Sequence, residues 1–200
     1  MPCWCPSGAG YGRSDGPSFS EEVAGDFAQP NFVSRMQLES DDVLAAVDFL
    51  ASVPFVDRNR LAIMGWSFGG IVTMLAASRS SVFRAAVNQA GGTLVWDRSP
   101  VLRQALIAAA RSTHPPVLLT VAQNDRTMAS ITTLADILRE RNPATELIVY
   151  PPFNPVDNPR GRGVAPGHML FSDQGSAVWQ GDLRTFLAKH LGGNPSAPLR

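Results

Sequence analysis

The sequence from Gly65 to Gly70 reads Gly-Trp-Ser-Phe-Gly-Gly, a Gly-x-Ser-x-Gly element set between two apolar segments. Leu61 to Met64 before it has the length of a buried strand, and Ile71 to Ala77 after it suits a helix. Strand, tight turn and helix is the order that holds a serine on a sharp bend. The flanking glycines fit, because a side chain two residues before or after the serine would collide with the crossing strand or helix. We therefore expect Ser67 to stand exposed at the carboxyl end of a sheet strand.

The rest of the chain alternates short apolar segments with amphipathic ones. After an irregular, Gly-rich opening, we predict helices at residues 38–53, 68–78, 100–111, 128–141 and 176–191, and strands at 60–64, 83–89, 117–122 and 146–150. Residues 152–167, which are rich in Pro, Gly and Asn, are predicted to form a loop. Strands that are apolar almost throughout and alternate with helices predict a parallel sheet covered on both faces. The expected fold class is α/β, a three-layer α/β/α sandwich with a mostly parallel sheet.

Composition sets outer limits on domain organisation and partners. Two hundred residues with 44% hydrophobic side chains suit one domain, 1–200, which we expect to start irregularly at 1–16 and to fray at 192–200. Seventeen basic and seventeen acidic side chains give a formal net charge of zero, which argues against nucleic acid or an anionic membrane as a partner. The apolar runs are far shorter than the roughly 20 residues of a membrane helix, and the N-terminus has no signal-peptide pattern. We therefore expect a cytoplasmic protein.

Cys3 and Cys5 are the only two cysteines. A single intervening residue would strain a disulfide between them, and no other metal ligand clusters nearby in the sequence. We interpret both as free thiols and expect no metal site.

Three residues with complementary chemistry follow predicted strands. Ser67 and Asp125 each come shortly after a strand, and His168 lies in the loop after the last one. Ligands and catalytic groups gather at the carboxyl ends of the strands in such a sheet. A serine hydroxyl needs a histidine to remove its proton, and an aspartate fixes the tautomer of that histidine. We therefore predict a charge-relay site in the chain order Ser, Asp, His.

Other histidines and acids are less well placed. His114 lies at a strand entrance, at the wrong end of the sheet, and His190 lies on the final helix, where we expect it to face solvent. Asp157 and Asp173 are alternative acids, but neither sits directly at a strand end. An isolated aspartate is more often a turn former or a helix cap. The position of Asp125 after a buried strand favours the catalytic interpretation.

Two segments carry a resemblance to a known group of proteins. Residues 56–70 read Val-Asp-Arg-Asn-Arg-Leu-Ala-Ile-Met-Gly-Trp-Ser-Phe-Gly-Gly, and residues 10–16 read Gly-Tyr-Gly-Arg-Ser-Asp-Gly. The first resembles the Val-Asp…Arg…Gly-x-Ser-x-Gly-Gly stretch of the dienelactone hydrolase and prolyl oligopeptidase branches of the α/β-hydrolase superfamily. The second is similar to the Gly-x-Gly-x-Ser segment after the fourth strand of many hydrolases. The resemblance covers about residues 8–190.

The resemblance implies an acyl-enzyme mechanism without a cofactor. It makes Ser67 the nucleophile, His168 the general base and then the acid, and Asp125 the residue that orients the imidazole. It also makes the backbone N–H of Phe68 one donor to the oxyanion. Tyr11 is a candidate for a second donor, because a tyrosine has this role in prolyl-oligopeptidase-like enzymes; a structural role for Tyr11 is the alternative.

The leading functional prediction is a carboxylesterase that acts on a small-molecule ester or related acyl substrate. Dienelactone hydrolases generally use cysteine, so serine favours ordinary ester or peptide substrates. A serine peptidase of the prolyl-oligopeptidase type is one alternative, because Gly-Trp-Ser-Phe-Gly-Gly resembles the dipeptidyl-peptidase elbow, although the chain has no propeller-type repeat. A catalytically weak hydrolase-like fragment or binding module is the other alternative.

The resemblance begins near the fourth strand of the family, which predicts an N-terminally shortened fold. No segment corresponds to the first three strands or to the loop with the second oxyanion donor, and one donor is worth roughly 3 to 4 kcal/mol. In the family's strand order, this leaves the strand at 60–64 with an unpaired edge, which is a template for association. We expect the chain either to form a homo-oligomer through this edge or to fold its segment from Cys3 to Tyr11 into the vacancy.

Overall fold

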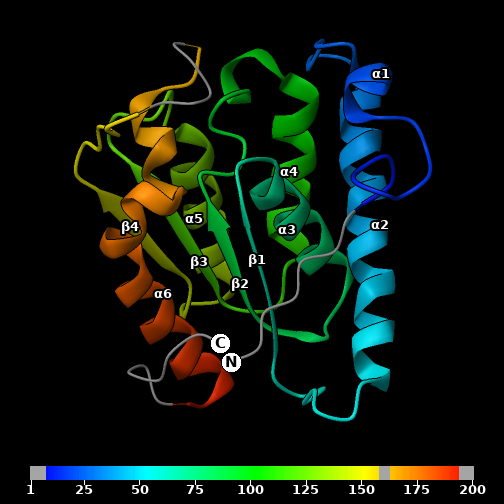
Figure 1. Cartoon of the computed structure of the whole chain (residues 1–200). Helices are drawn as coiled ribbons and strands as arrows, with labels where there is room; N and C mark the ends of the chain where they lie inside the picture. The colour runs from blue at the N-terminus through cyan, green and yellow to red at the C-terminus, as the bar shows by residue number, and fades with distance from the viewer. Residues whose placement is uncertain (1–7, 158–162, 194–200) are drawn as a thin grey trace.

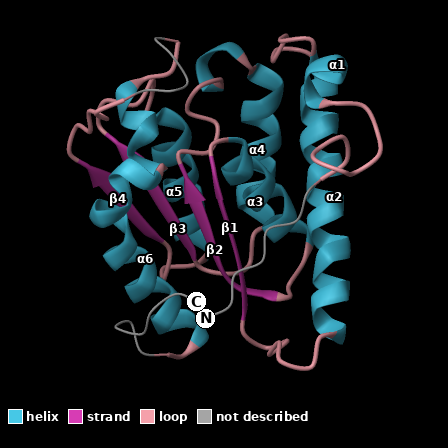
Figure 2. Ribbon diagram, viewed as in Figure 1, coloured by secondary structure: helices cyan, strands magenta, loops and turns pink. Residues whose placement is uncertain are grey.

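The computed structural model describes residues 8–157 and 163–193 (Figure 1). One sheet contains four parallel strands in the order β1-β2-β3-β4, so that strands consecutive in the chain are neighbours in space (Figure 2). The strands are β1 (Leu61–Trp66), β2 (Phe83–Gln89), β3 (Val117–Ala122) and β4 (Glu146–Tyr150). The α-helices are α1 (Phe19–Val23), α2 (Pro30–Ser52), α3 (Phe68–Arg79), α4 (Pro100–Ser112), α5 (Ala129–Arg141) and α6 (Ser176–Leu191).

Alternate side chains of the strands bury opposite faces of the sheet, as the two-residue period of a strand requires. Ile63, Ala86 and Leu119 lie on the face that α3 and α5 contact, in one apolar cluster with residues of α2 and α4. Val87 and Leu118 pack against Phe186 and other residues of α6 on the other face. In Figure 1, α6 crosses the near face of the sheet and α3 and α4 lie behind it. The predicted three-layer α/β/α arrangement is confirmed.

All four predicted strands are present, and the predicted ends of β2, β3 and β4 agree with the structure. Helices α3 to α6 also lie where their apolar periodicity predicts them, to within one residue at each end. Strand β1 continues two residues beyond its predicted end, so that Ser67 directly follows its last residue.

The opening of the chain is more helical than predicted. Helix α2 begins at Pro30 rather than at residue 38, since a proline is well suited to a first helical turn and the early side chains Phe32 and Met36 are buried. Helix α1 was not predicted, although Ser18 and Glu21 form a capping box in which each side chain bonds the backbone of the other residue. The Ser-x-x-Glu spacing was the sequence signal for this helix.

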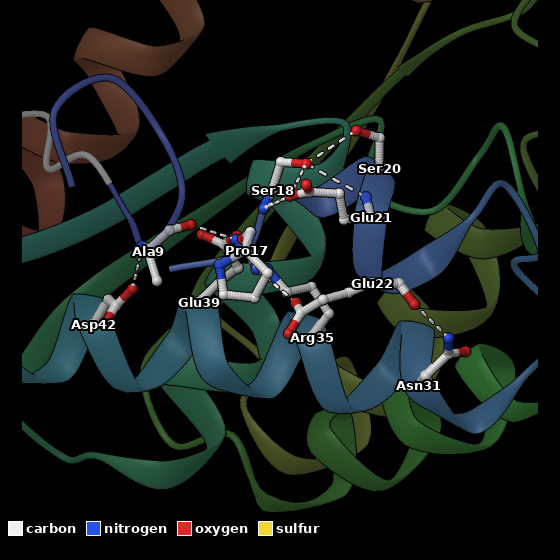
Figure 3. A network of polar contacts seen from close by, with 10 residues as sticks. All are labelled: Ala9, Pro17, Ser18, Ser20, Glu21, Glu22, Asn31, Arg35, Glu39 and Asp42. Carbon is white, nitrogen blue, oxygen red and sulfur yellow. Dashed lines mark hydrogen bonds and ion pairs between the residues drawn. The ribbon is translucent and has the colours of Figure 1, made fainter. Parts of the chain in front are cut away.

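One buried arginine of α2 holds the segment of residues 9–22 against this helix, as Figure 3 shows. Arg35 is 2% exposed and donates to the backbone oxygens of Pro17 at 2.9 Å and Ala9 at 2.5 Å. Its charge is balanced by the carboxylates of Glu22 and Glu39, at 2.5 and 2.8 Å. Five donors in a rigid plane allow arginine to join four acceptors at once. The segment is therefore fixed by polar contacts rather than by pairing with the sheet.

Strand β1 lies at the edge of the sheet, as predicted, and within the described residues it pairs only with β2. The described part of the segment expected beside it, from Gly8 to Tyr11, forms turns rather than a strand. Cys3 and Cys5 lie outside the described residues, as do 194–200 of the predicted frayed tail. None of the described helices combines the length and the apolar character needed to cross a membrane. The single-domain assignment stays a prediction.

Candidate active site

The turn between β1 and α3 holds Ser67 in a strained backbone conformation. Ser67 has φ 58° and ψ −116°, a region that residues with a side chain rarely occupy. Its N–H donates to the carbonyl of Gln89 at 2.9 Å, and its own carbonyl accepts the N–H of Gly70 at 3.0 Å. The turn is therefore tied to β2 on one side and to the first turn of α3 on the other.

The glycines of this turn do not have equivalent roles. A Cβ on Gly65 would lie 2.1 Å from the backbone of Gly69, and a Cβ on Gly70 would lie 2.5 Å from Asn88 Oδ1. A Cβ on Gly69 would meet nothing within 4 Å. The expectation that a side chain two residues after the serine would collide is therefore wrong. The close approach requires the absence of a side chain at Gly65, because the backbone of the helix passes directly over it.

His168 reaches the site from a 3₁₀ helix, η2 (Pro166–Phe171), rather than from an irregular loop. Leu170 and Phe171 anchor η2 over the strand ends by packing with Ala122 and Tyr150. The imidazole is fully buried, with Nε2 2.9 Å from Ser67 Oγ. On its other side, Nδ1 lies 2.9 Å from Asp125 Oδ2. The structure thus brings together the three residues that the sequence singled out.

Asp125 sits in the turn after β3, where its N–H donates to the carbonyl of Ala122 at 3.1 Å. Its side chain is fully buried, and Oδ1 accepts the N–H of Arg126 at 2.6 Å. The alternative acids lie elsewhere. Asp157 is exposed and bonds Gln174 through its backbone, and Asp173 is exposed at the start of a short 3₁₀ helix.

The two other histidines are remote from this cluster. The carbonyl of His114 accepts from Asn142, before β3 begins. His190 lies near the end of α6, and the expectation that it faces solvent is wrong: its ring is half-buried against Phe186, with the centroids 4.6 Å apart. Burial is the main cause that lowers the pKa of His190 below its usual range.

Four further residues contact Ser67, Asp125 or His168, or the turns that contain them. The sequence analysis did not identify these four residues. The ring of Trp66 packs against the imidazole of His168, with the centroids 5.6 Å apart. Asn124 bonds both the N–H and the carbonyl of Phe153, each at 2.9 Å. The four neighbours are Trp66, Thr93, Asn124 and Gly167.

Two of these neighbours had a partial sequence signal. Trp66 lies inside the elbow motif, and Gly167 directly precedes the histidine. Thr93 and Asn124 gave no signal of their own, because their contacts involve residues about 30 or more positions away in the chain.

The two predicted oxyanion donors differ in position. Phe68 is the first residue of α3, so its N–H has no acceptor within the helix, and its role as an oxyanion donor stays a prediction. Tyr11 instead stacks on the guanidinium of Arg35 at 5.6 Å, and burial, followed by the Glu39 carboxylate, raises the pKa of its hydroxyl. Its described contacts favour the structural alternative, and its role as a donor stays a prediction.

A cavity of about 420 Å³ adjoins the first turn of α3, between α2 and the edge of β1. Tyr11, Phe68 and Gly69 line it, together with Met36 and Met64. The described residues contain no group of three or more His, Cys, Asp or Glu side chains that could hold a metal ion.

Comparison with known proteins places these features in context. The sequence model of the prolyl oligopeptidase family matches residues 33–99. Dipeptidyl peptidase 8 of Mus musculus is 42% identical over 60 residues, 29% of this chain and 7% of that protein. The Salmonella typhi protein named "Putative carboxymethylenebutenolidase" is 33% identical over 143 residues, 66% of this chain and 52% of that protein. The chain thus spans about half, or far less, of the length of these relatives.

Among solved structures, the chain is similar to a Mycobacterium tuberculosis puromycin-hydrolyzing peptidase. The two share 18% sequence identity with a TM-score of 0.62, over 82% of this chain and 28% of that one. This likeness concerns the fold.

Proposed function

Because this chain belongs to the α/β-hydrolase superfamily, we propose that it is a serine hydrolase that cleaves carboxylic ester or related acyl bonds. One observation carries the proposal: Ser67 Oγ, the His168 imidazole and the Asp125 carboxylate are joined in series at 2.9 Å each. That is the reach a general base needs to take a proton from a nucleophile.

Each residue of the proposed active site has a separate role in the reaction. His168 Nε2 removes the proton of Ser67 Oγ as the oxygen attacks the substrate carbonyl, and Asp125 stabilises the resulting imidazolium through Nδ1–H. The Phe68 N–H donates to the oxyanion. The imidazolium then protonates the departing alcohol, which leaves an acyl group on Ser67. Water activated by His168 releases the acid in the second half of the reaction.

The preference for esters over peptides has a specific basis. The relative matched over 66% of the chain carries the name of a butenolide hydrolase, and a butenolide is a cyclic ester, whereas the dipeptidyl peptidase match covers 29%. A peptidase of the prolyl-oligopeptidase type remains the second candidate, since the family match covers residues 33–99.

The test combines labelling with turnover. A fluorophosphonate probe is expected to label the wild-type chain at Ser67 and to leave Ser67→Ala unlabelled. Hydrolysis of a short-chain aryl ester should fall by about 10⁴-fold or more in Ser67→Ala, Asp125→Asn and His168→Ala, because triad members act as a unit. Asp157→Asn and Asp173→Asn serve as matched acid controls and should keep wild-type turnover.

Four outcomes would contradict this assignment. Undiminished labelling of Ser67→Ala would remove the nucleophile, and a larger loss in Asp157→Asn or Asp173→Asn would reassign the acid. Cleavage of a dipeptide anilide in preference to the aryl ester would favour the peptidase. An unreactive wild-type chain would indicate the hydrolase-like binding module.

A further inference from the structure

A threonine hydroxyl lies against both Asp125 and His168. Thr93 Oγ1 is 3.1 Å from Asp125 Oδ2 and 3.1 Å from His168 Nδ1. The side chain is fully buried, so bulk water does not compete for these contacts. Thr93 comes from the segment after β2, 32 residues before Asp125 and 75 before His168.

The backbone conformation of the turn that leads to Thr93 is tightly constrained. Ala90 has φ 53° and Gly92 has φ 82°, both in the left-handed region, so an ordinary residue is held there beside a glycine. The side chain of Asn88 accepts the N–H of Gly91 at 2.8 Å, and the carbonyl of Thr120 accepts the N–H of Ala90 at 2.8 Å. Two strands thus fix the turn, and with it the position of the hydroxyl.

The hydroxyl completes the surroundings of a buried carboxylate. Within the described chain, no lysine or arginine side chain forms an ion pair with Asp125. Its oxygens depend instead on the N–H of Arg126 at 2.6 Å, on His168 Nδ1 at 2.9 Å, and on Thr93. A buried carboxylate without such donors is costly, because nothing replaces its lost water.

The single hydrogen of Thr93 can serve one acceptor at a time. The carbonyl of Ala90, 3.2 Å away, is the alternative to Asp125 Oδ2. Hydrogen bonds to an ionised carboxylate are stronger than those to a neutral carbonyl, so the hydroxyl donates to Asp125. The Nδ1–H of His168 donates mainly to Asp125 Oδ2 at 2.9 Å, and the Thr93 oxygen, 3.1 Å from Nδ1, offers it a second, weaker acceptor. Both acceptors keep the proton on Nδ1 and leave Nε2 free to act as the base.

We propose that Thr93 is a positioning residue that holds Asp125 and His168 in the orientation in which Nε2 faces Ser67. The proposal rests on the proposed serine-hydrolase function and adds a fourth side chain to it. Thr93 acts through Asp125 and His168 and does not touch the substrate.

The experiment removes the hydroxyl of Thr93 and preserves the shape of its side chain. Thr93→Val should lower kcat for a short-chain aryl ester by about 10- to 100-fold with KM nearly unchanged, since one hydrogen bond to a charged group is lost. Thr93→Ser keeps the hydroxyl and should recover most of the activity. Thr113→Val is the matched control, because Thr113 is another buried threonine whose hydroxyl bonds the carbonyl of Ala109 at 2.9 Å, and it should leave kcat unchanged.

A double-mutant cycle separates positioning from a general structural effect. If Thr93 acts through Asp125, Thr93→Val should slow fluorophosphonate labelling strongly in the wild-type background and hardly at all in Asp125→Ala. Equal, additive losses in both backgrounds would overturn the proposal. Thr93→Ala, with urea unfolding of each variant, provides a second route if the valine variant does not fold.

Proton NMR of the Nδ1–H of His168 gives a readout that does not depend on turnover. Its resonance should move in Thr93→Val and stay in place in Thr113→Val. An active wild-type chain with unchanged resonance and kcat in Thr93→Val would overturn the Thr93 proposal alone. An unreactive wild-type chain whose resonance still moves would contradict the proposed function while supporting the hydrogen bond.

Discussion

At the scale of single residues, a buried hydroxyl in this protein stabilises or destabilises the folded state according to whether it has a hydrogen-bond partner. Thr93 joins two charged or titratable groups, and Thr113 bonds a helix carbonyl. Thr120 is the one polar residue of β3, is 1% exposed, and its hydroxyl has no hydrogen-bond partner within the described residues. A buried hydroxyl without a partner destabilises the folded state.

We therefore predict that Thr120→Val raises the free energy of unfolding by about 1 kcal/mol, because it replaces an unpaired hydroxyl with a methyl group of similar size. Urea unfolding followed by circular dichroism measures the change. Thr113→Val should lower the same quantity by about 1 kcal/mol, since the buried hydrogen bond from its hydroxyl to the carbonyl of Ala109 is lost, although that carbonyl keeps the N–H of Thr113. A loss of stability in Thr120→Val would mean that its hydroxyl has an acceptor.

At the scale of elements, the site depends on how η2 docks onto the turn after β3. Gly167 donates its N–H to the carbonyl of Asn124 at 3.3 Å, and a Cβ at this position would lie 2.4 Å from Asn124 Oδ1 and 2.5 Å from the backbone nitrogen of Asp125. A backbone atom cannot yield as a flexible side chain can. The absence of a side chain at Gly167 is thus what lets His168 come within hydrogen-bond distance of Asp125.

Gly167→Ala should push η2 away from this turn and lower ester turnover by about 100-fold, the loss that a displacement of about 1 Å causes at a reacting centre. The matched control is Gly181→Ala in α6, where an added Cβ meets nothing within 4 Å. That change should leave turnover unaltered and raise the free energy of unfolding by about 1 kcal/mol, because alanine favours helix. Wild-type kcat in Gly167→Ala would show that η2 can shift without moving the imidazole.

At the scale of the whole molecule, β1 is an edge strand of the sheet that the described residues form. The N–H of Ser67 points toward β2, and successive peptide groups of a strand alternate in direction, so those of Ala62 and Met64 face away from β2. The Met64 side chain is 42% exposed beside this edge. An exposed apolar edge strand tends to pair with another strand.

We expect the chain to self-associate through β1 at micromolar concentration, and light scattering after size-exclusion chromatography measures the mass. Met64→Lys should shift the population toward monomer, because a lysine on an edge strand opposes pairing. Val178→Lys adds the same charge at a residue of α6 that is 47% exposed, and should leave the mass unchanged. A monodisperse wild-type monomer with full esterase activity would refute the association.

The sequence by itself determined the order of strands and helices from β1 onward, since each element carries its own apolar periodicity and its own terminating residues. It also determined which three side chains meet, because parallel strands bring their carboxyl ends to one edge and Ser67, Asp125 and His168 all follow strand ends. The catalytic roles of the three stay predictions, which the labelling experiment tests.

Only the tertiary structure decided the rest of the site. Thr93 lies beside Asp125 and His168 because a turn fixed by two strands delivers it there, and no spacing along the chain encodes that contact. His190 is half-buried because Phe186 packs against its ring, although a position near the end of a helix suggested exposure. Local patterns specify an element and its buried face, whereas contacts between segments far apart in the chain depend on how those elements pack.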